Sequence, residues 1–458
     1  MSQSFDAIII GAGQAGPPLA GRLTAAGMKV ALIERKLIGG TCVNTGCMPT
    51  KALVASAYAA HLARRRDLGV IAGEVRVDMA AVAARAQKVA GDARERNEAW
   101  LGKMEGLTLF RGHARLTGPT SVSVDGEDLS APRIFLNVGG RASVPDMPGV
   151  GEIPHLDNTD MVALDTLPAH LVVVGGSYIG LEFAQMYARF GAKVTIVERA
   201  ARLIAREDPE ISETIRSILE AEGITVRTDA NCIGFRPHHG GVVVSVDCRS
   251  GEPEVIGSHV LLALGRRPNT DDLGLDAAGI TTDERGYIAV NDRLETNVAG
   301  IWALGDCNGR GAFTHTAYND FEIVAANLLD GEDRRLSQRI PGYALYIDPP
   351  LGRAGMTETE ARAKGHEVLV STRPMARVGR AIEKGETQGM MKVIADRASR
   401  HILGAAILGT SGDEAIHGIL DAMSAGEPLD VLRWAVPVHP TVSELIPTLL
   451  LGLDEGKA

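Results

Sequence analysis

The side chains with the strongest chemical potential are two cysteines five residues apart, Cys42 and Cys47. They lie in the run Gly-Gly-Thr-Cys-Val-Asn-Thr-Gly-Cys-Met-Pro-Thr-Lys over residues 39–51. The chain has only five cysteines in 458 residues, too few for a disulfide scaffold. No second Cys-x-x-Cys or His-rich segment stands nearby to complete a zinc site, so we expect no metal centre. The pair therefore predicts a redox dithiol.

The segment before the cysteines is typical of a strand, a glycine loop and a helix. Its landmarks are an apolar strand at 7–10, Gly11, Gly13 and Gly16 in the loop, a helix end near Gly27, and a strand at 29–33 that ends at Glu34. The glycines let the backbone approach a pyrophosphate, which rests on the helix N-terminus. The glutamate can accept hydrogen bonds from a ribose hydroxyl. We therefore expect a dinucleotide site.

The same pattern recurs later in the chain at one constant offset. The repeated landmarks are a strand at 171–174, Gly175, Ser177, Gly180, a helix end near Gly191, and a strand at 193–197 followed by Glu198. One such motif is weak evidence, but two in register, each with its acidic residue, are strong. Ser177 replaces the middle glycine and is small enough to keep the pyrophosphate close. The sequence predicts two bound dinucleotides.

Three other segments support this organisation. The strand at 300–306 ends in Gly305-Asp306, where a carboxylate can hold a ribityl or ribose hydroxyl. The junctions at 137–141 and 264–269 bracket the second nucleotide unit and resemble crossings between domains. Beyond Arg339 the glycine motifs end. Strands at 367–371 and 391–394 and helical stretches at 413–425 and 443–453 indicate an α+β domain there.

Composition narrows the function classes. A net charge of −10 argues against nucleic acid and anionic membrane partners, because both require clustered positive charge. No stretch approaches the roughly 18 apolar residues that span a bilayer. The N-terminal apolar run enters a glycine loop directly and indicates a buried strand rather than a signal peptide. We expect a cytoplasmic protein, where a permanent structural disulfide would be unusual.

Taken together, these motifs and the late run His-Pro-Thr-Val-Ser-Glu at 439–444 resemble the class I pyridine nucleotide-disulfide oxidoreductases over the whole chain. Those flavin enzymes include lipoamide dehydrogenase, glutathione reductase and mercuric reductase. Within the family, residues 283–286 and 349–358 are similar to mercuric-reductase-like and reactive-chlorine-resistance flavin reductases. The resemblance implies an α/β fold with two Rossmann-like domains and a C-terminal α+β dimerisation domain. The implied boundaries are 1–145 with 267–338 for FAD, 146–266 for NAD(P), and 339–458 for the interface.

The resemblance also implies residue roles. FAD occupies the first site and a nicotinamide the second, with Cys47 as the thiol against the flavin and Cys42 as the thiol that attacks substrate. Lys51 and Glu182 match an ion pair beside the flavin. His439, oriented by Glu444, matches a general acid that reaches the partner subunit's dithiol, which implies a homodimer. The implied cofactor positions are Gly11, Gly13, Gly16, Glu34, Gly40, Thr41, Lys51, Gly139, Gly175, Ser177, Gly180, Glu198, Gly265 and Asp306.

Physical chemistry agrees with these roles. A dithiol takes two electrons, NAD(P)H supplies a hydride, and a flavin can accept from one and pass to the other. Cys47 precedes a helical stretch, whose positive end favours the reactive thiolate. Histidine titrates near neutral pH, as a general acid for a leaving thiolate must. Glu182 stands in an apolar segment, and a buried carboxylate needs a partner.

Departures from the family pattern limit the choice of electron acceptor. Mercuric reductases carry a C-terminal cysteine pair and a tyrosine in place of the histidine, whereas this chain ends without cysteine and has His439. We therefore expect a small disulfide, a metal ion or another oxidant as acceptor, but not true mercury reduction. One alternative is a dihydrolipoamide dehydrogenase. An alternative of another class is a dithiol redox sensor or electron-transfer module with little turnover.

The sequence also gives expectations for the coenzyme preference and for the three remaining cysteines. Glu198 suits a free ribose 2′-hydroxyl and favours NADH, while Arg199 and Arg202 could accept a 2′-phosphate, so we expect NADH preference with measurable NADPH use. The other cysteines, Cys232, Cys248 and Cys307, are isolated in sequence and are expected to be structural.

Overall fold

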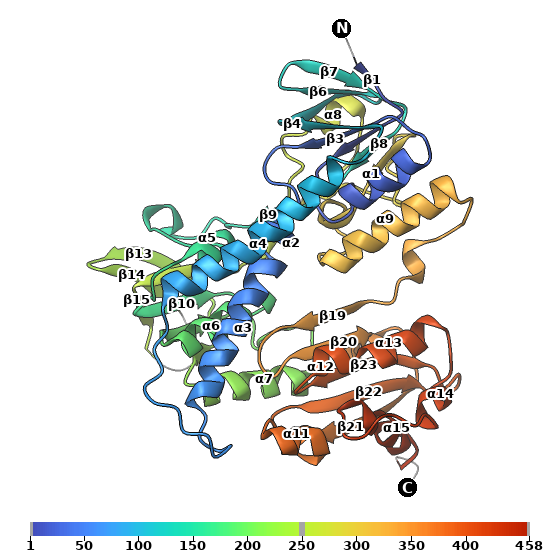
Figure 1. Ribbon diagram of the computed structural model, residues 1–458. Helices are drawn as coiled ribbons and strands as arrows, with labels where there is room; N and C mark the ends of the chain where they lie inside the picture. Colours follow the sequence, from blue (N-terminus) through green and yellow to red (C-terminus); the bar gives the residue numbers. More distant parts are fainter. Residues whose placement is uncertain (1–2, 247–251, 456–458) are drawn as a thin grey trace. The chain divides into compact units, whose positions relative to one another are not determined.

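The computed structural model describes residues 3–246 and 252–455, and the chain divides into two compact units (Figure 1). Unit 1 comprises Met1–Ala52, Ala83–Val144 and Leu264–Arg339, and unit 2 comprises Leu53–Val82, Pro145–Ala263 and Ile340–Ala458. The finer division into three domains stays a prediction, and Cys248 lies outside the described residues. Within those residues, no helix combines the length and the apolar character needed to cross a membrane.

Unit 1 is built on a parallel sheet of five strands in the order β18-β8-β2-β3-β4. The strands are β2 (Ala7–Ile10), β3 (Val30–Glu34), β4 (Leu107–Arg111), β8 (Ile134–Leu136) and β18 (Ile301–Ala303). Along β2, Ile8 and Ile10 pack into one core cluster while Ala7 and Ile9 pack into another. Both faces of the sheet are therefore covered, which explains why this strand is apolar throughout.

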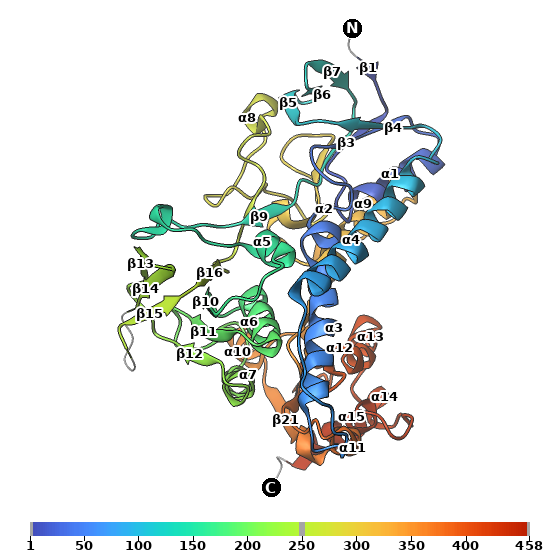
Figure 2. The ribbon, with the colours of Figure 1, turned by 60° about the vertical axis from the view of Figure 1, so that its left-hand side comes forward.

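Helices α1 (Gly16–Ala25) and α9 (Thr314–Leu329) lie side by side on one face of this sheet (Figures 1 and 2). Leu19 and Leu23 from α1 and Phe321 from α9 share a core cluster with Ile9. A smaller sheet, β1-β7-β6-β5, contributes to the opposite cluster. Its strands are β1 (Gln3–Ser4), β5 (Ala114–Gly118), β6 (Ser121–Val124) and β7 (Glu127–Ser130), and α8 (Leu275–Ala278) contacts β5.

The dithiol segment forms two helices, α2 (Gly40–Asn44) and α3 (Cys47–Arg64). Helices α3 and α4 (Met79–Leu101) each have residues in both units. The two expected crossings contain β9 (Gly140–Ala142) and β17 (Arg266–Pro268), which pair antiparallel within unit 1 close to the breaks at 144/145 and 263/264.

Unit 2 contains a second parallel sheet in the order β12-β11-β10-β16. Its strands are β10 (His170–Val174), β11 (Lys193–Val197), β12 (Thr225–Arg227) and β16 (His259–Leu262), with helices α5 (Asn158–Ala163), α6 (Tyr178–Phe190) and α7 (Pro209–Ala221). A three-stranded antiparallel sheet adds β13 (Gly234–His238), β14 (Gly241–Ser245) and β15 (Glu254–Gly257). The β10–α6–β11 segment repeats the β2–α1–β3 arrangement of unit 1, as the constant offset predicts.

The C-terminal part of unit 2 is an antiparallel sheet, β19-β20-β23-β22-β21. Its strands are β19 (Gly342–Leu345), β20 (Leu351–Gly355), β21 (Val368–Pro374), β22 (Met390–Asp396) and β23 (Ile402–Leu408). Met391 and Val393 of β22 face an apolar core, whereas Lys392 between them enters a buried ionic cluster. This alternation follows from the two-residue period of a strand.

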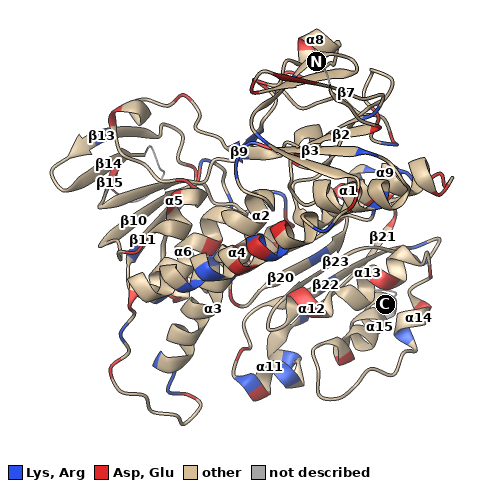
Figure 3. Cartoon of the chain, turned by 45° about the horizontal axis from the view of Figure 1, so that its top comes forward, with Lys and Arg blue, Asp and Glu red and all other residues tan. Residues whose placement is uncertain are grey.

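Short helices complete unit 2. They are α10 (Glu358–Ala363), α11 (Gly379–Lys384), α12 (Gly412–Ala415), α13 (His417–Ser424), α14 (Asp430–Arg433) and α15 (Ile446–Glu455). The 3-10 turns of unit 2 are η1 (Val150–Glu152), η4 (Met375–Arg377) and η5 (Ser443–Leu445), and those of unit 1 are η2 (Gly305–Asn308) and η3 (Leu336–Gln338). Acidic and basic residues are interspersed along α4 and α11 (Figure 3), as in the exposed pair of Lys88 and Asp92.

Candidate active site

The two redox cysteines lie on successive helices of unit 1. Cys42 is in α2 and is partly buried, whereas Cys47 is the first residue of α3 and is exposed. The Asn44 amide donates to the carbonyls of Ile38 and Gly40, each at 2.9 Å, and so holds the turn between them. Both cysteines are free thiols in the structure and are hydrogen bonded to each other.

The environment makes the two thiols unequal. The hydrogen bond from Cys42 lowers the pKa of Cys47 to about 6, with further help from the hydroxyl of Thr314 and the charge of Lys51, while burial opposes the shift. The hydrogen bond to Cys47 and burial raise the pKa of Cys42 and outweigh an opposite effect of Thr314. Near neutral pH, Cys47 is therefore the thiolate and Cys42 the thiol.

Thr314 is a site residue that sequence reasoning missed. Its Oγ1 lies 3.1 Å from Sγ of Cys47, although the two residues are far apart in the chain. Nothing in the local sequence marks this threonine, because the contact depends on where the first turn of α9 is placed by the fold.

The first glycine loop has the backbone that a pyrophosphate requires. Gly11 has φ +106°, and a Cβ on it would lie 2.2 Å from the Asn137 carbonyl. A Cβ on Gly16 would lie 2.3 Å from the Gly11 carbonyl, and one on Gly40 would lie 2.9 Å from Cα of Gly13. Helix α1 begins without a side-chain cap, so its N-terminus is open to an anion. These residues fit the phosphates of FAD.

The second loop repeats this geometry. A Cβ on Gly175, which has φ +116°, would lie 2.4 Å from the Ala263 carbonyl, and one on Gly180 would lie 2.0 Å from the Gly175 carbonyl. Ser177, in place of the middle glycine, is an exposed N-cap residue with an extended backbone and makes no side-chain cap. The loop therefore tolerates the serine, and the start of α6 is open to a phosphate.

Glu34 and Glu198, the acidic residues that follow the two loops, accept equivalent backbone hydrogen bonds. Glu34 accepts hydrogen bonds from the backbone N–H of Ala12 at 2.9 Å and of Lys36 at 2.8 Å. Glu198 accepts from the backbone N–H of Gly176 at 2.6 Å and of Ala200 at 2.7 Å. The repeat in sequence is thus also a repeat in hydrogen bonding, in which each carboxylate closes its own loop. The expected bond from each carboxylate to a ribose stays a prediction.

The remaining predicted cofactor positions, Lys51 included, also belong to unit 1. Asp306 follows β18 in η2, where burial raises the pKa of its carboxyl and Arg266, with Nε 3.6 Å from Oδ2, opposes that shift. Gly139 and Gly265 have φ values of +65° and +100°, which favour glycine. Thr41 is an exposed residue in the first turn of α2.

Lys51 lies in unit 1, and Glu182 lies in unit 2. Lys51 lies one turn after Cys47 on α3, where its charge helps to lower the pKa of that thiol. Glu182 is buried on α6, and its Oε1 accepts a hydrogen bond from the Tyr346 N–H at 3.0 Å. The expected ion pair between Lys51 and Glu182 stays a prediction.

His439 and Glu444 form a dyad in unit 2. His439 Nδ1 lies 2.7 Å from Glu444 Oε2, and the histidine side chain is 79% exposed. The segment before it exposes three apolar side chains, Trp434, Val436 and Val438, and Val436 is 96% exposed. The expectation that this dyad reaches a partner subunit's dithiol stays a prediction.

The two other described cysteines differ in environment. Cys307 is fully buried, its thiol donates to the carbonyls of Leu136 and Leu304, and burial raises its pKa to about 12. Cys232 is exposed. Cys307 is therefore a packed, unreactive thiol.

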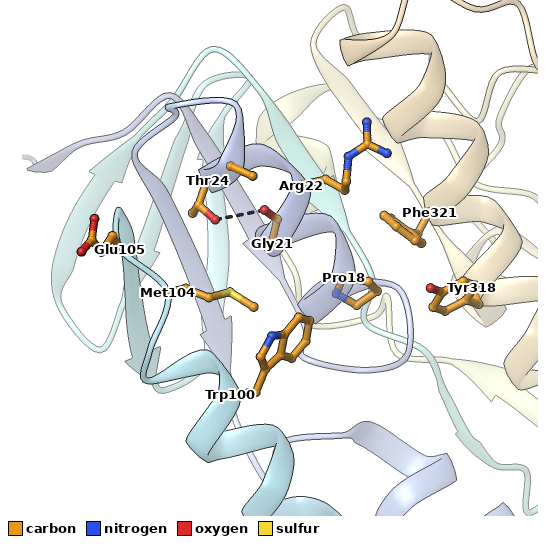
Figure 4. A pocket seen from close by; sticks show the side chains of 10 residues that line it. Pro18, Gly21, Arg22, Thr24, Trp100, Met104, Glu105, Tyr318 and Phe321 are labelled. Atoms are coloured by element: carbon orange, nitrogen blue, oxygen red, sulfur yellow. Dashed lines mark hydrogen bonds between the residues drawn. The ribbon is translucent and has the colours of Figure 1, made fainter.

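An open hollow of about 620 Å³ lies elsewhere on unit 1, between α1, the end of α4 and α9 (Figure 4). Trp100 and Met104 line one side, and Tyr318 and Phe321 line the other. Since none of the predicted cofactor or redox residues lines it, we do not include it in the candidate active site.

Two equivalent nucleotide loops and a thiol–thiolate pair define a dithiol oxidoreductase that takes two dinucleotides. Residues 5–320 match the family described as pyridine nucleotide-disulphide oxidoreductase, and residues 341–450 match its dimerisation domain. The chain therefore belongs to the pyridine nucleotide-disulphide oxidoreductase family, and the expected α/β fold with a C-terminal dimerisation domain is confirmed.

The chain is similar to family members of several named activities. The chain is 36% identical to the probable pyridine nucleotide-disulfide oxidoreductase RclA of Escherichia coli, over 96% of this chain and 97% of that protein. It is 32% identical to a dihydrolipoyl dehydrogenase of Thermus scotoductus, covering 96% of each, and 30% identical to a mercuric reductase of Bacillus cereus, covering 98% and 72%. A solved Cu(II) complex of the HOCl-induced flavoprotein disulfide reductase RclA from Escherichia coli superimposes with TM-score 0.89 at 35% identity, over 98% of this chain and 99% of that one. The protein is thus an NAD(P)H-dependent flavoprotein oxidoreductase that uses FAD.

Proposed function

We propose that the protein passes electrons from NAD(P)H, through FAD and the Cys42–Cys47 pair, to a small disulfide or to an oxidised metal ion such as Cu(II). The observation that carries this proposal is the pair of free thiols on successive helices, Cys42 on α2 and Cys47 at the start of α3, with Cys47 Sγ 3.1 Å from Thr314 Oγ1. The opposite directions of their pKa shifts agree with a thiol and a thiolate. The likeness to a flavoprotein disulfide reductase solved as a Cu(II) complex supports the choice of acceptors. FAD, when bound, takes a hydride from the nicotinamide and supplies two electrons to the cysteine disulfide.

The cysteines perform the remaining steps with a disulfide acceptor. Cys42 loses its proton to a base and attacks one acceptor sulfur, which breaks the acceptor S–S bond and releases one thiolate. The Cys47 thiolate then attacks Sγ of Cys42, which re-forms the internal disulfide and releases the second thiolate. The proton taken from Cys42 goes to one product thiolate, and a proton from solvent goes to the other, so that two product thiols leave. For Cu(II), the dithiol gives one electron to each of two ions, and the disulfide forms again.

We further propose that the acid and base in these steps is the partner subunit's His439, in a homodimer. The match to a dimerisation domain and the exposed apolar segment before His439 support this arrangement. Mixing Cys42→Ser and His439→Ala protomers should restore one competent site per heterodimer. No recovery of activity after subunit exchange would contradict transfer between subunits.

The first experiment is an anaerobic titration of the purified holoenzyme with NADH, followed by thiol counting under denaturing conditions. We expect two new thiols per chain in the wild type and none in Cys42→Ser or Cys47→Ser. Cys232→Ser is the matched control, because that cysteine is exposed but is not in the dithiol. Turnover with glutathione disulfide, dithiobis(nitrobenzoate) and Cu(II) then identifies the acceptor class. Thiol formation without turnover on any of them would favour a redox sensor.

Dihydrolipoamide dehydrogenase activity is a second candidate. The dyad of His439 and Glu444 favours it, since reduction of a dithiolane needs a general acid at the leaving thiolate. Three dihydrolipoyl dehydrogenases of 32–34% identity are among the relatives. Turnover with lipoamide that exceeds turnover with Cu(II) and small linear disulfides would favour this candidate. We also propose a cytoplasmic location, because a dithiol that must be re-reduced fits a reducing compartment.

A further inference from the structure

Thr314 makes a side-chain contact to Cys47 from a distant part of the chain. Its Oγ1 lies 3.1 Å from Sγ of Cys47. A thiolate can only accept a hydrogen bond, so with Cys47 ionised the hydroxyl of Thr314 is the donor. Hydrogen bonds to charged groups are roughly twice as strong as neutral ones, which makes this contact relevant to the sulfur's charge state.

The placement of the two residues strengthens this effect. Cys47 is the first residue of α3, an 18-residue helix, and Thr314 is the first residue of α9, a 16-residue helix. The positive ends of two long helices therefore meet at one sulfur atom. Each favours an anion within its first turn.

Hydrogen bonds fix the first turn of α9, and they therefore fix the position of the Thr314 hydroxyl. The Phe313 N–H donates to Oγ1 of Thr316 at 3.1 Å, and the same hydroxyl donates back to the Phe313 carbonyl at 2.7 Å. Further along α9, the buried Asp320 accepts from the Gly305 N–H at 2.7 Å and from the Asn308 amide at 2.9 Å. These bonds fasten α9 to η2, beside Asp306.

We propose that Thr314 is a catalytic residue of this dithiol: its hydroxyl donates to the sulfur of Cys47 and stabilises the Cys47 anion. The inference rests on the proposed cycling of the pair. It gives each cysteine one role, because the stabilised sulfur is the better leaving group when the internal disulfide is opened. Cys42 is then released as the nucleophile for the acceptor.

The test measures the charge of Cys47 directly. The holoenzyme is reduced with dithiothreitol, excess reductant is removed anaerobically, and the rate of Cys47 alkylation by iodoacetamide is followed against pH by peptide mass spectrometry. We expect a midpoint near pH 6 in the wild type. Thr314→Val, which keeps the shape but removes the hydroxyl, should raise the midpoint by about one unit, a tenfold change in the ionisation constant. Thr314→Ser should restore it.

Thr316→Val is the matched control. It disturbs the same helix start but leaves the hydroxyl on Cys47, so the midpoint should stay within a few tenths of a unit of the wild type. An equal shift in Thr316→Val and Thr314→Val, or no shift in Thr314→Val, would overturn the assignment of Thr314. Circular dichroism and bound flavin absorbance confirm that each variant is folded. Absence of NADH-driven thiol formation in the wild type would instead contradict the proposed function and leave this result standing.

Discussion

His439 Nδ1 is hydrogen bonded to Glu444 Oε2 at 2.7 Å, so the ring has Nε2 available for proton transfer. A carboxylate only accepts, so Nδ1 carries the proton and Nε2 is the atom left for proton transfer to an acceptor. The ring thus has a set tautomer and a set direction.

His439→Ala should therefore reduce turnover of disulfides by about 10² to 10⁴-fold, the usual contribution of a positioned general acid. Glu444→Gln should cause a smaller loss, because the ring remains but is held by a weaker bond. NADH-driven thiol formation should be unchanged in both. His401→Ala is the control, since Nε2 of that exposed ring lies 3.1 Å from the Gly426 carbonyl and the residue does not belong to the dyad. Equal losses in all three variants would refute the assignment.

The pH dependence of the reduced enzyme should follow Cys47. The pKa of this thiol is lowered to about 6, so the thiolate is present above that pH and is lost as the pH falls through it. Disulfide formation between the cysteines should accordingly slow below about pH 6 when the dithiol-reduced enzyme is mixed with an acceptor in a stopped-flow instrument. A midpoint near the ordinary thiol value, about 8.5, would show that the site does not stabilise the anion.

Gly180→Ala should impair the second nucleotide site, because the added Cβ would stand 2.0 Å from the Gly175 carbonyl. We expect kcat/KM for NADH to fall at least about tenfold, equivalent to 1.4 kcal/mol, while the protein keeps its FAD absorbance. Gly151→Ala is the matched control, as nothing lies within 4 Å of its added Cβ. If both variants bind NADH like the wild type, the second loop is not the nicotinamide site.

Glu198 should make NADH the preferred coenzyme, with measurable use of NADPH through the exposed Arg199 or Arg202. Glu198→Ala should lower the NADH to NADPH ratio of kcat/KM, because it removes the charge that repels a 2′-phosphate. The KM for the electron acceptor should not change. A tenfold or greater preference of the wild type for NADPH, about 1.4 kcal/mol, would contradict this interpretation.

The buried ion pairs of unit 2, which join Arg353 and Lys392 to Glu207 and Asp208, should be important for stability. Arg353 is 1% exposed and bonds to Glu207, which is equally buried, so removal of one partner leaves an unpaired charge in the interior. Arg353→Met should lower the free energy of unfolding by about 3–5 kcal/mol, measured by urea denaturation. Arg380→Met, at an exposed pair with Glu383, should change it by less than about 1 kcal/mol. The double variant Arg353→Met with Glu207→Gln should recover part of the loss.

The sequence alone determined the features that are local or repeated. The strand, loop and helix around Gly11 and Gly16, and their counterparts around Gly175 and Gly180, follow from backbone requirements that only glycine meets. The dithiol segment, the start of a helix at Cys47 and the closeness of His439 to Glu444 also depend on residues near each other in the chain.

Only the tertiary structure decided which distant groups meet. Thr314 reaches Cys47 because α9 packs beside α1 on the sheet, and no local pattern records that contact. Lys392 and Arg353 resemble ordinary strand residues in the sequence, yet both are buried against carboxylates from Glu207 and Asp208. Spacing along a chain specifies backbone geometry, whereas the charge state of a side chain depends on neighbours that the fold brings close. The chemistry of Cys47 therefore depends both on the local helix start and on the distant residue Thr314.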